Sequence, residues 1–162
     1  MPIFMKYDGI TGDVKSAGYE KWIMLESCQF GAHRNIANTS GRGQNREASA
    51  PSVSEIVVTK KQDCASSNLF RASLWGEGKK VNIHFCKTDK DKVEKYMEIE
   101  MENVLVSSFN VSGHGGDGND RPMESLSLNY TKITFSTTQM DDKNATGKAE
   151  RAMWDQAALK GS

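Results

Sequence analysis

Alternation of apolar and polar residues with a period of two is the strongest pattern in this sequence. It is clearest over residues 79–87, where Val81, Ile83 and Phe85 occupy every second position. Because successive side chains of a strand point to opposite faces, this pattern predicts a strand with one buried face. Similar segments recur at residues 3–7, 21–30, 53–60, 93–101, 103–111, 123–130 and 131–139. Seven or eight short strands separated by turns predict a mainly β protein, either a barrel or a sandwich.

One short helix interrupts the strands. Ser66 or Ser67 is suited to cap its start, residues 68–75 have helical character, and Gly76 marks its end. The apolar residues Leu69, Phe70 and Leu74 lie at helical spacing, which predicts one buried stripe.

Residues 31–52 cannot belong to a core, because Ile36 is their only large apolar side chain. We therefore predict an exposed extended loop or a protruding hairpin there. A connection of this length is unusual within a compact domain and is commonly functional. We interpret residues 1–162 as a single domain and residues 140–162 as a polar C-terminal tail.

The charge balance argues against nucleic acid as a partner. Lys plus Arg and Asp plus Glu each number 21, so the chain is formally neutral. A neutral chain has no global field that steers it onto nucleic acid, and it offers little repulsion between copies. The start of the sequence lacks the apolar run of a signal peptide, and no stretch approaches membrane-spanning length. We expect synthesis in the cytoplasm, no membrane insertion, and any export to proceed without a cleavable leader.

The sequence offers little sign of catalysis. Its three cysteines, at 28, 64 and 86, are widely spaced, and its three histidines, at 33, 84 and 114, form no metal-binding motif. The glycines around residues 113–118 match neither a P-loop nor a dinucleotide fingerprint. A Cys–His pair formed in space stays open at this point. We predict no enzyme activity, no metal and no cofactor.

Several segments resemble the haemolysin-coregulated protein (Hcp) family and occur in that family's order. Residues 3–12 resemble its opening strand and turn, and residues 22–31 its second strand, which ends in an aromatic residue and glycine. Residues 60–69 resemble its Asp-x-x-Ser-Pro-x-Leu start of the helix but lack the proline that the family often has there. Residues 104–108 and 124–130, with the Gly-rich turn between them, form the most specific match.

This resemblance implies a two-sheet antiparallel β-barrel with one short helix, assembled as a homohexameric ring. Rings of that family stack into the hollow tube of a type VI secretion system, which is exported and functions in virulence and bacterial competition. The implied partners are other copies of the chain, the sheath, a spike protein and small effector proteins carried in the lumen.

Two groups of residues are predicted to serve this assembly. On the strand at 21–30, Cys28 and Phe30 should face the core, so that Ser27 and Gln29 face the lumen and its cargo. The loop at 31–52 should carry the contacts between rings, through Arg34, Asn35, Asn38, Arg42, Gln44, Asn45, Arg46 and Glu47. The alternative function is a monomeric β-barrel that binds a ligand, and the size of the protein in solution separates the two hypotheses.

Overall fold

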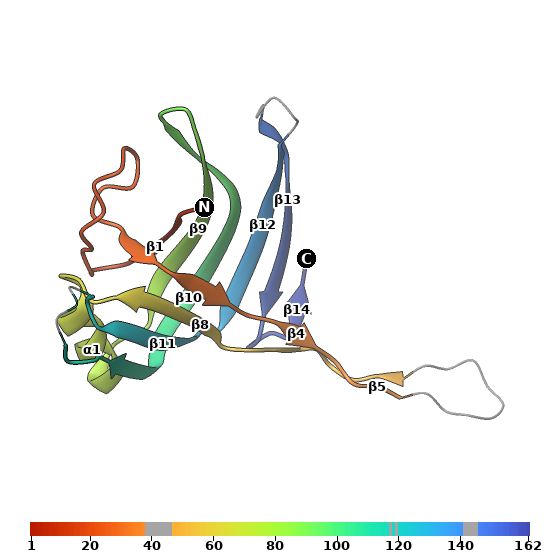
Figure 1. Cartoon of the computed structure of the whole chain (residues 1–162). Helices are drawn as coiled ribbons and strands as arrows, with labels where there is room; N and C mark the ends of the chain where they lie inside the picture. Colours follow the sequence, from red (N-terminus) through yellow and green to blue (C-terminus); the bar gives the residue numbers. More distant parts are fainter. Residues whose placement is uncertain (38–46, 117, 119, 141–145) are drawn as a thin grey trace.

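The chain folds into two antiparallel β-sheets that share one long strand. The computed structural model describes residues 1–37, 47–116, 118, 120–140 and 146–162 (Figure 1). The large sheet has the strand order β14 (Lys160–Gly161), β13 (Thr146–Asp155), β12 (Lys132–Met140), β10 (Lys92–Ser112), β9 (Lys79–Asp89), β1 (Ile3–Tyr7) and β2 (Ile23–Leu25). The small sheet has the order β10, β11 (Met123–Asn129), β8 (Ile56–Lys61) and β3 (Ser27–Gln29). The predicted mainly β class is confirmed.

Strand β10 bends from one sheet into the other. Its first half pairs with β9 and β12, and its second half pairs with β11. The pairing with β9 shifts register between Met101 and Val104, and Asn103 between them has a positive φ of 54°. Asparagine tolerates this left-handed conformation better than most residues. The two strands predicted for 93–101 and 103–111 are therefore one strand with a bend.

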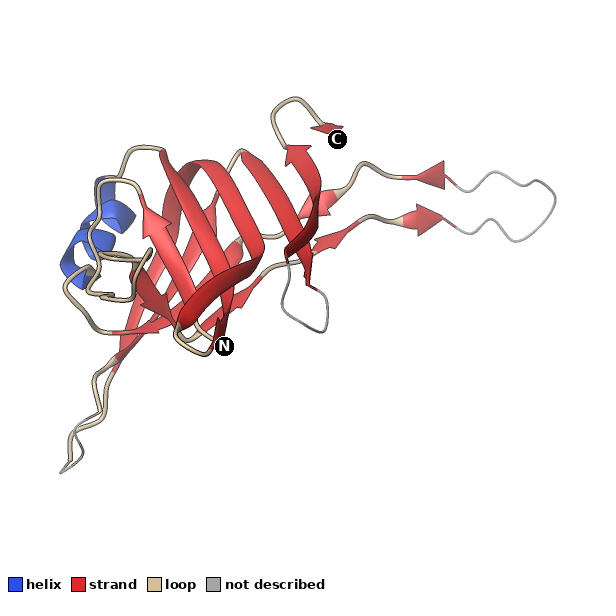
Figure 2. Ribbon diagram, turned by 90° about the horizontal axis from the view of Figure 1, so that it is seen from above, coloured by secondary structure: helices blue, strands red, loops and turns tan. Residues whose placement is uncertain are grey.

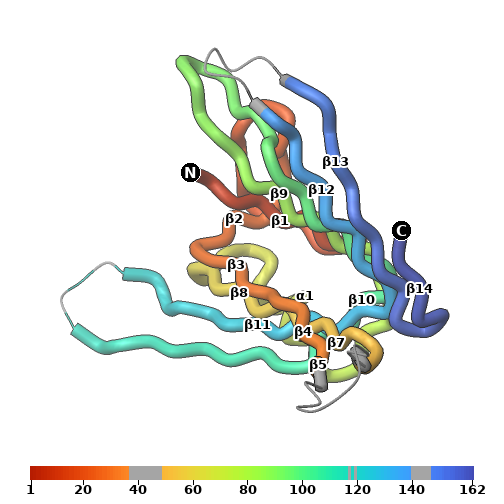
Figure 3. The backbone as a smooth tube through the Cα atoms, turned by 90° about the vertical axis from the view of Figure 1, so that its right-hand side faces the viewer, coloured from red at the N-terminus to blue at the C-terminus, as the bar shows by residue number. Residues whose placement is uncertain are grey.

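The second link between the sheets is the chain itself, at Glu26. Strands β2 and β3 lie at two ends of the hydrogen-bonded ladder, and the Glu26 N–H donates to the carbonyl of Thr59 at 2.8 Å. Strands β2 and β3 follow each other in the chain but do not pair with each other. Within the described residues the hydrogen-bonded ladder therefore does not close into a complete barrel. Figure 3 shows the two sheets facing each other.

The apolar core fills the space between the two sheets. Fully buried side chains come from β1, β2, β8, β9, β10 and β11, among them Met5, Ile23, Ile56, Val58, Ile83, Ile99, Leu126 and Leu128. Helix α1 (Ser66–Trp75) contributes Leu69, which is fully buried, and Ala72, which packs against the core. Ser66 is the first helical residue and Ala65 is the N-cap. The prediction that Ser66 or Ser67 caps the helix is therefore wrong.

The predicted buried stripe of α1 is only partly correct. Leu69 is buried, but Phe70 and Leu74 are exposed, at 50% and 55% of their surface. The helix lies across one end of the core and contacts β10, so a single narrow line of side chains reaches inward. The helical spacing alone does not distinguish that line from its neighbours.

A second, smaller cluster lies on the outside of the large sheet. Residues 12–22 fold over that face, and Tyr19 stacks on Phe4 with ring centroids 4.4 Å apart. Cys86 alternates with the inward residues of β9 and so points to this outer face, where the covering segment buries it fully. The strand alternation is as predicted, but the covering segment has no alternation of its own and could not be placed from the sequence.

Residues 31–37 and 47–53 form the two sides of a hairpin arm that projects from the sheets (Figures 1 and 2). Two short ladders build it, β4 (Ala32–His33) with β7 (Ser52–Val53), and β5 (Ile36–Ala37) with β6 (Glu47–Ala48). Of the two predicted forms, an extended loop or a hairpin, the described residues form a hairpin.

The predicted polar tail is instead mostly strand. Strand β13 pairs with β12 along its length, and the backbone of Ser162 exchanges two hydrogen bonds with Met153. The described side chains of β13 from residue 147 to 152 are exposed, so apolar burial leaves no period of two there. Backbone pairing at the margin of the sheet, rather than a hydrophobic face, accounts for this strand.

Candidate assembly surfaces

The outer face of the small sheet is polar and uncharged across its middle. Cross-strand pairing aligns two rows of side chains on this face. The first row is Ser27, Thr59, Ser125 and Asn110, and the second is Gln29, Val57, Ser127 and Ser108. The hydroxyls of Ser27 and Thr59 are hydrogen-bonded at 2.6 Å. We call these eight residues the hydroxyl face.

Ser27 and Gln29 are exposed on the hydroxyl face, while Cys28 and Phe30 pack against the core from the other side of the same strand. The ring of Phe30 lies 5.7 Å from that of Phe135. Earlier in this segment the inward positions are Ile23 and Leu25, so the alternation shifts by one residue at Glu26, where the chain changes sheets. The prediction of one strand over residues 21–30 is therefore wrong, because the segment forms two short strands with different inward positions.

The two sheets differ in the charge of their outer faces. On the large sheet, Glu98, Glu100 and Glu102 follow one another along β10, with Lys80 3.3 Å from Glu100 and Lys95 2.6 Å from Glu98. The hydroxyl face has no such charges in its two rows and is bounded by Glu55 at one end and Lys61 at the other. A surface of hydroxyls and amides offers weak, exchangeable hydrogen bonds and no fixed ionic partner.

Both edges of the small sheet have backbone groups available for pairing. Among the described residues, β3 pairs only with β8, and residues 105–112 of β10 pair only with β11. An unpaired strand edge is a template for pairing with another chain. The two edges belong to different strands, so they suit a head-to-tail contact between identical copies.

The hairpin arm carries the residues predicted to join rings. Arg34 and Asn35 are exposed, and the backbone N–H of Asn35 donates to the Ser49 hydroxyl at 3.0 Å across the hairpin. Glu47 lies in β6. The remaining predicted contacts fall outside the described residues, namely Asn38, Arg42, Gln44, Asn45 and Arg46.

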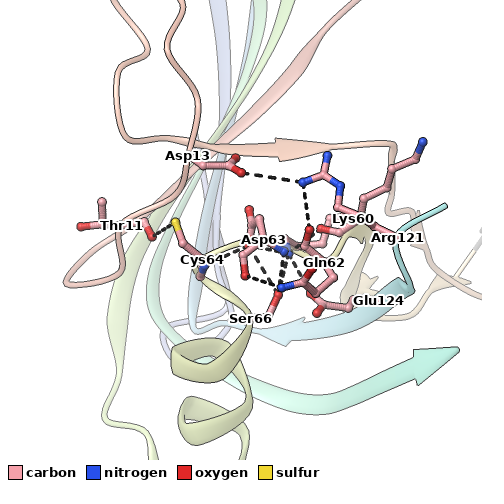
Figure 4. Close-up of polar contacts among 11 residues, drawn as sticks. Thr11, Asp13, Lys60, Gln62, Asp63, Cys64, Ser66, Arg121 and Glu124 are labelled. Atoms are coloured by element: carbon pink, nitrogen blue, oxygen red, sulfur yellow. Dashed lines mark hydrogen bonds and ion pairs between the residues drawn. The ribbon is translucent and has the colours of Figure 1, made fainter. Parts of the chain in front are cut away.

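A fully buried lysine holds three segments together where α1 begins (Figure 4). The ammonium of Lys60 on β8 donates to Asp63 Oδ1 at 2.8 Å, to Glu124 Oε2 on β11 at 2.7 Å and to the Lys61 carbonyl at 2.9 Å. Asp63 Oδ1 also accepts the N–H of Ala65 at 2.9 Å, just before the helix. The cluster therefore fixes the start of α1 against both strands.

The sequence interpretation missed this cluster, although a signal for it exists. With Ile56 and Val58 facing inward on β8, a period of two also places Lys60 inward. The same alternation on β11 places Glu124 on the inner side after Leu128 and Leu126, and the two charged residues are direct cross-strand partners. Two opposite charges at inward positions of neighbouring strands predict a buried pair.

Around the cluster, exposed polar contacts join two loops to the same region. Arg121 donates to the Gln62 carbonyl at 3.1 Å and lies 3.8 Å from Asp13, as Figure 4 shows. The thiol of Cys64 is 3.5 Å from the Thr11 carbonyl. These exposed contacts add little stability compared with the buried cluster.

A second polar network lies beneath residues 12–22 on the large sheet. His84 Nδ1 is 3.2 Å from the Tyr19 hydroxyl, and His84 Nε2 is 2.9 Å from Glu98 Oε1. Burial, together with the nearby Lys95 ammonium, lowers the pKa of His84 below its usual value and outweighs the opposing influence of the Glu98 carboxylate. Burial alone would raise the pKa of Glu98, but hydrogen bonds from Lys95 and His84 outweigh it and leave that pKa lowered.

These two shifts predict that the protein loses stability as the pH falls from 7 towards 5. The unfolded chain protonates its histidines near pH 6.5, whereas folding disfavours the charged form of His84, so the unfolded state binds more protons in this range. The lowered pKa of Glu98 acts in the same direction at lower pH. The slope is at most about 1.4 kcal/mol per pH unit for each titrating group.

Urea unfolding of the protein and of His84→Gln at pH 7 and pH 5 tests this expectation. The variant should depend less on pH, and His114→Gln, which changes an exposed histidine, should behave like the parent. Equal pH dependence in the parent and His84→Gln would show that His84 is not responsible.

The described residues provide no assembled metal-binding group. They contain no cluster of three His, Cys, Asp or Glu side chains placed to hold a metal ion. Burial raises the pKa of the Cys28 thiol to about 12, and Cys86 is fully buried. No described helix has both the length and the apolar character needed to cross a membrane.

A matching family model and three similar solved structures are all of type VI secretion system or Hcp proteins. The family described as "Type VI secretion system effector, Hcp" matches residues 4–136. A solved structure described as a type six secretion system protein superposes with a TM-score of 0.92, at 26% identity over 99% of both chains. Hcp1 from Salmonella typhimurium superposes with a TM-score of 0.77, at 22% identity over 99% of this chain and 98% of its own. A type VI secretion system effector from Yersinia pestis gives a TM-score of 0.70, at 22% identity over 94% and 98%. Curated protein sequences gave no match.

Proposed function

We propose that this chain, which belongs to the Hcp family of type VI secretion system proteins, is a structural subunit that forms hexameric rings, which stack into a hollow, exported tube. The family consists of structural tube proteins rather than enzymes. The observation that most supports the proposal in this chain is the uncharged hydroxyl face on a sheet with two free edges.

The positions of β3 and β10 at opposite edges of the small sheet support the proposed ring. Pairing between β3 of one copy and the second half of β10 in the next is a head-to-tail contact, and such a contact closes into a ring when its rotation permits. It would continue the small sheet from copy to copy and place every hydroxyl face on one wall. Zero net charge leaves little long-range repulsion against this assembly.

Light scattering of the purified protein tests the ring. The expected particle mass is six times the 17.9 kDa of one chain. A monomer over a wide range of concentrations would contradict the ring and favour the alternative, a monomeric ligand-binding module.

We further propose that the hydroxyl face lines the channel and holds small effectors weakly enough for them to slide. Replacing Gln29 with arginine should then abolish or strongly reduce retention of an effector that copurifies with the parent, because six bulky charges would enter the channel wall. Co-purification measures retention, and light scattering should show that the rings stay intact.

Gln139→Arg is the matched control, because Gln139 is an exposed glutamine on β12 of the large sheet. It should leave effector retention unchanged. Unchanged retention in Gln29→Arg, or equal losses in both variants, would count against this face as the channel wall.

The hairpin arm is proposed to join one ring to the next. Its many hydrogen-bond donors and single acidic residue suit wet contacts that are individually weak, about 0–1 kcal/mol for each exposed ion pair. Six arms acting together would make such contacts effective. The remaining proposed partners are the sheath, a spike protein and small effectors. Synthesis in the cytoplasm would precede export through the secretion system itself.

A further inference from the structure

Helix α1 exposes an apolar surface that nothing in its own chain covers in the described part of the structure. Phe70, Leu74 and Trp75 are exposed to 50%, 55% and 72%, and Val111 on β10 to 57%. The Phe70 ring lies 5.7 Å from that of Phe109, so the surface continues from the helix onto the strand. We call these five residues the helix patch. A contiguous exposed apolar area of this kind marks an interaction site.

A shallow depression of about 290 Å³ extends the helix patch beyond Trp75 towards the turn after β1. Four charged residues line it, two acidic and two basic: Asp8, Glu77, Arg71 and Lys79. Their formal charges cancel, so the depression does not by itself select a charged ligand. The apolar side chains beside it supply the main driving force for any contact.

The helix patch and the hairpin arm lie at opposite ends of the same strand. The arm connects to β8 just before Ile56, and α1 follows β8 just after Lys61. Figures 1 and 2 both show α1 at one end of the molecule and the arm projecting from the other. When one ring stacks on the next in the same orientation, the arm end of a copy in one ring meets the α1 end of a copy in the neighbouring ring.

The arm has the composition to bind the body of another copy. Residues 31–52 contain three arginines and one glutamate, a formal charge of +2, so the rest of this neutral chain carries −2. Opposite net charges bring the two parts of neighbouring copies together. Ile36, the only large apolar residue in the sequence from 31 to 52, is 49% exposed on β5 and has a surface to bury.

We propose that the arm of one copy docks on the helix patch of a copy in the next ring, with Ile36 contacting Leu74 and Trp75. This inference rests on the proposed assembly of identical subunits and names the surface that the arm binds. The proposed contact explains why α1 buries only Leu69 completely and leaves its other large apolar side chains exposed.

Disulfide trapping tests the contact in the full chain. In a Cys64→Ser background, which removes the exposed native thiol, Ile36→Cys and Leu74→Cys are introduced together and mild oxidation follows. Two cysteines link only when their Cα atoms approach within about 7 Å. Covalent dimers and larger multimers should form on a non-reducing gel, and each single-cysteine variant should give at least tenfold less.

The control replaces Leu74→Cys with Leu159→Cys, because Leu159 is exposed to 63% but lies near the C-terminus. That pair should not link. Absence of linked multimers in the Ile36–Leu74 pair, in a sample that electron microscopy shows to contain stacked rings, would overturn the inference and leave the proposed function standing. A protein that stays monomeric would contradict the proposed function itself.

A second variant tests the same surface without cysteines. Leu74→Ser combined with Trp75→Ser changes only exposed side chains, so the fold should persist, and assembly should require at least tenfold more protein. Leu159→Ser should assemble like the parent. Unchanged assembly in the double variant would overturn the docking proposal.

Discussion

Replacing Lys60 with methionine is expected to lower the free energy of unfolding by about 3–5 kcal/mol, because it leaves two buried carboxylates without their counter-ion. Lys60 is fully buried and Glu124 is 2% exposed, so water cannot replace the lost ammonium. A domain of this size is stable by only about 5–15 kcal/mol in total, so the loss is a large share. Chemical denaturation of both proteins measures it.

Lys61→Met is the matched control, since Lys61 is the exposed neighbour on the same strand. It should change stability by no more than about 0.5 kcal/mol. Adding Asp63→Asn and Glu124→Gln to Lys60→Met should recover part of the loss, because both uncompensated charges disappear. A cost below about 1 kcal/mol for Lys60→Met would show that the cluster does not hold the start of α1 in the way its geometry indicates.

Deleting residues 38–45 from the arm is expected to abolish tubes and secretion while leaving the fold and the ring intact. No residue of the apolar core is removed, and the two ladders at the base of the arm lie outside the deletion. Because six arms act together, losing all of them removes a multivalent contact rather than one weak bond. Electron microscopy counts the tubes, light scattering measures the rings, and denaturation measures the fold.

A deletion of the same length at residues 113–120, the connection between β10 and β11, serves as the control and should still allow tubes. Tubes formed by the arm deletion would reduce the arm to an ordinary loop. Rings that fall apart would place its contact within the ring instead.

Much of the fold was predictable because its strands bury one face. The alternation of Val81, Ile83 and Phe85 gave the inward side of β9 correctly, and the polar composition of residues 31–52 correctly predicted a projecting segment. Strand β13 was not predictable, since its exposed side chains carry no apolar period and only backbone pairing forms it.

The assembly surfaces were predictable only in part. Alternation placed Ser27 and Gln29 opposite Cys28 and Phe30, but the shift at Glu26 depends on the chain changing sheets, which no local pattern shows. Exposure of Phe70 and Leu74 likewise follows from how α1 lies across the end of the core. An apolar residue at helical spacing has the same sequence signature whether its partner is the core of its own chain or another chain.

Electron microscopy of the purified protein tests the central claim most directly. The account predicts rings of six copies with a hollow centre, which stack end to end into tubes at high concentration. Closed particles without a channel, or a uniform population of single 17.9 kDa chains at every concentration, would contradict it.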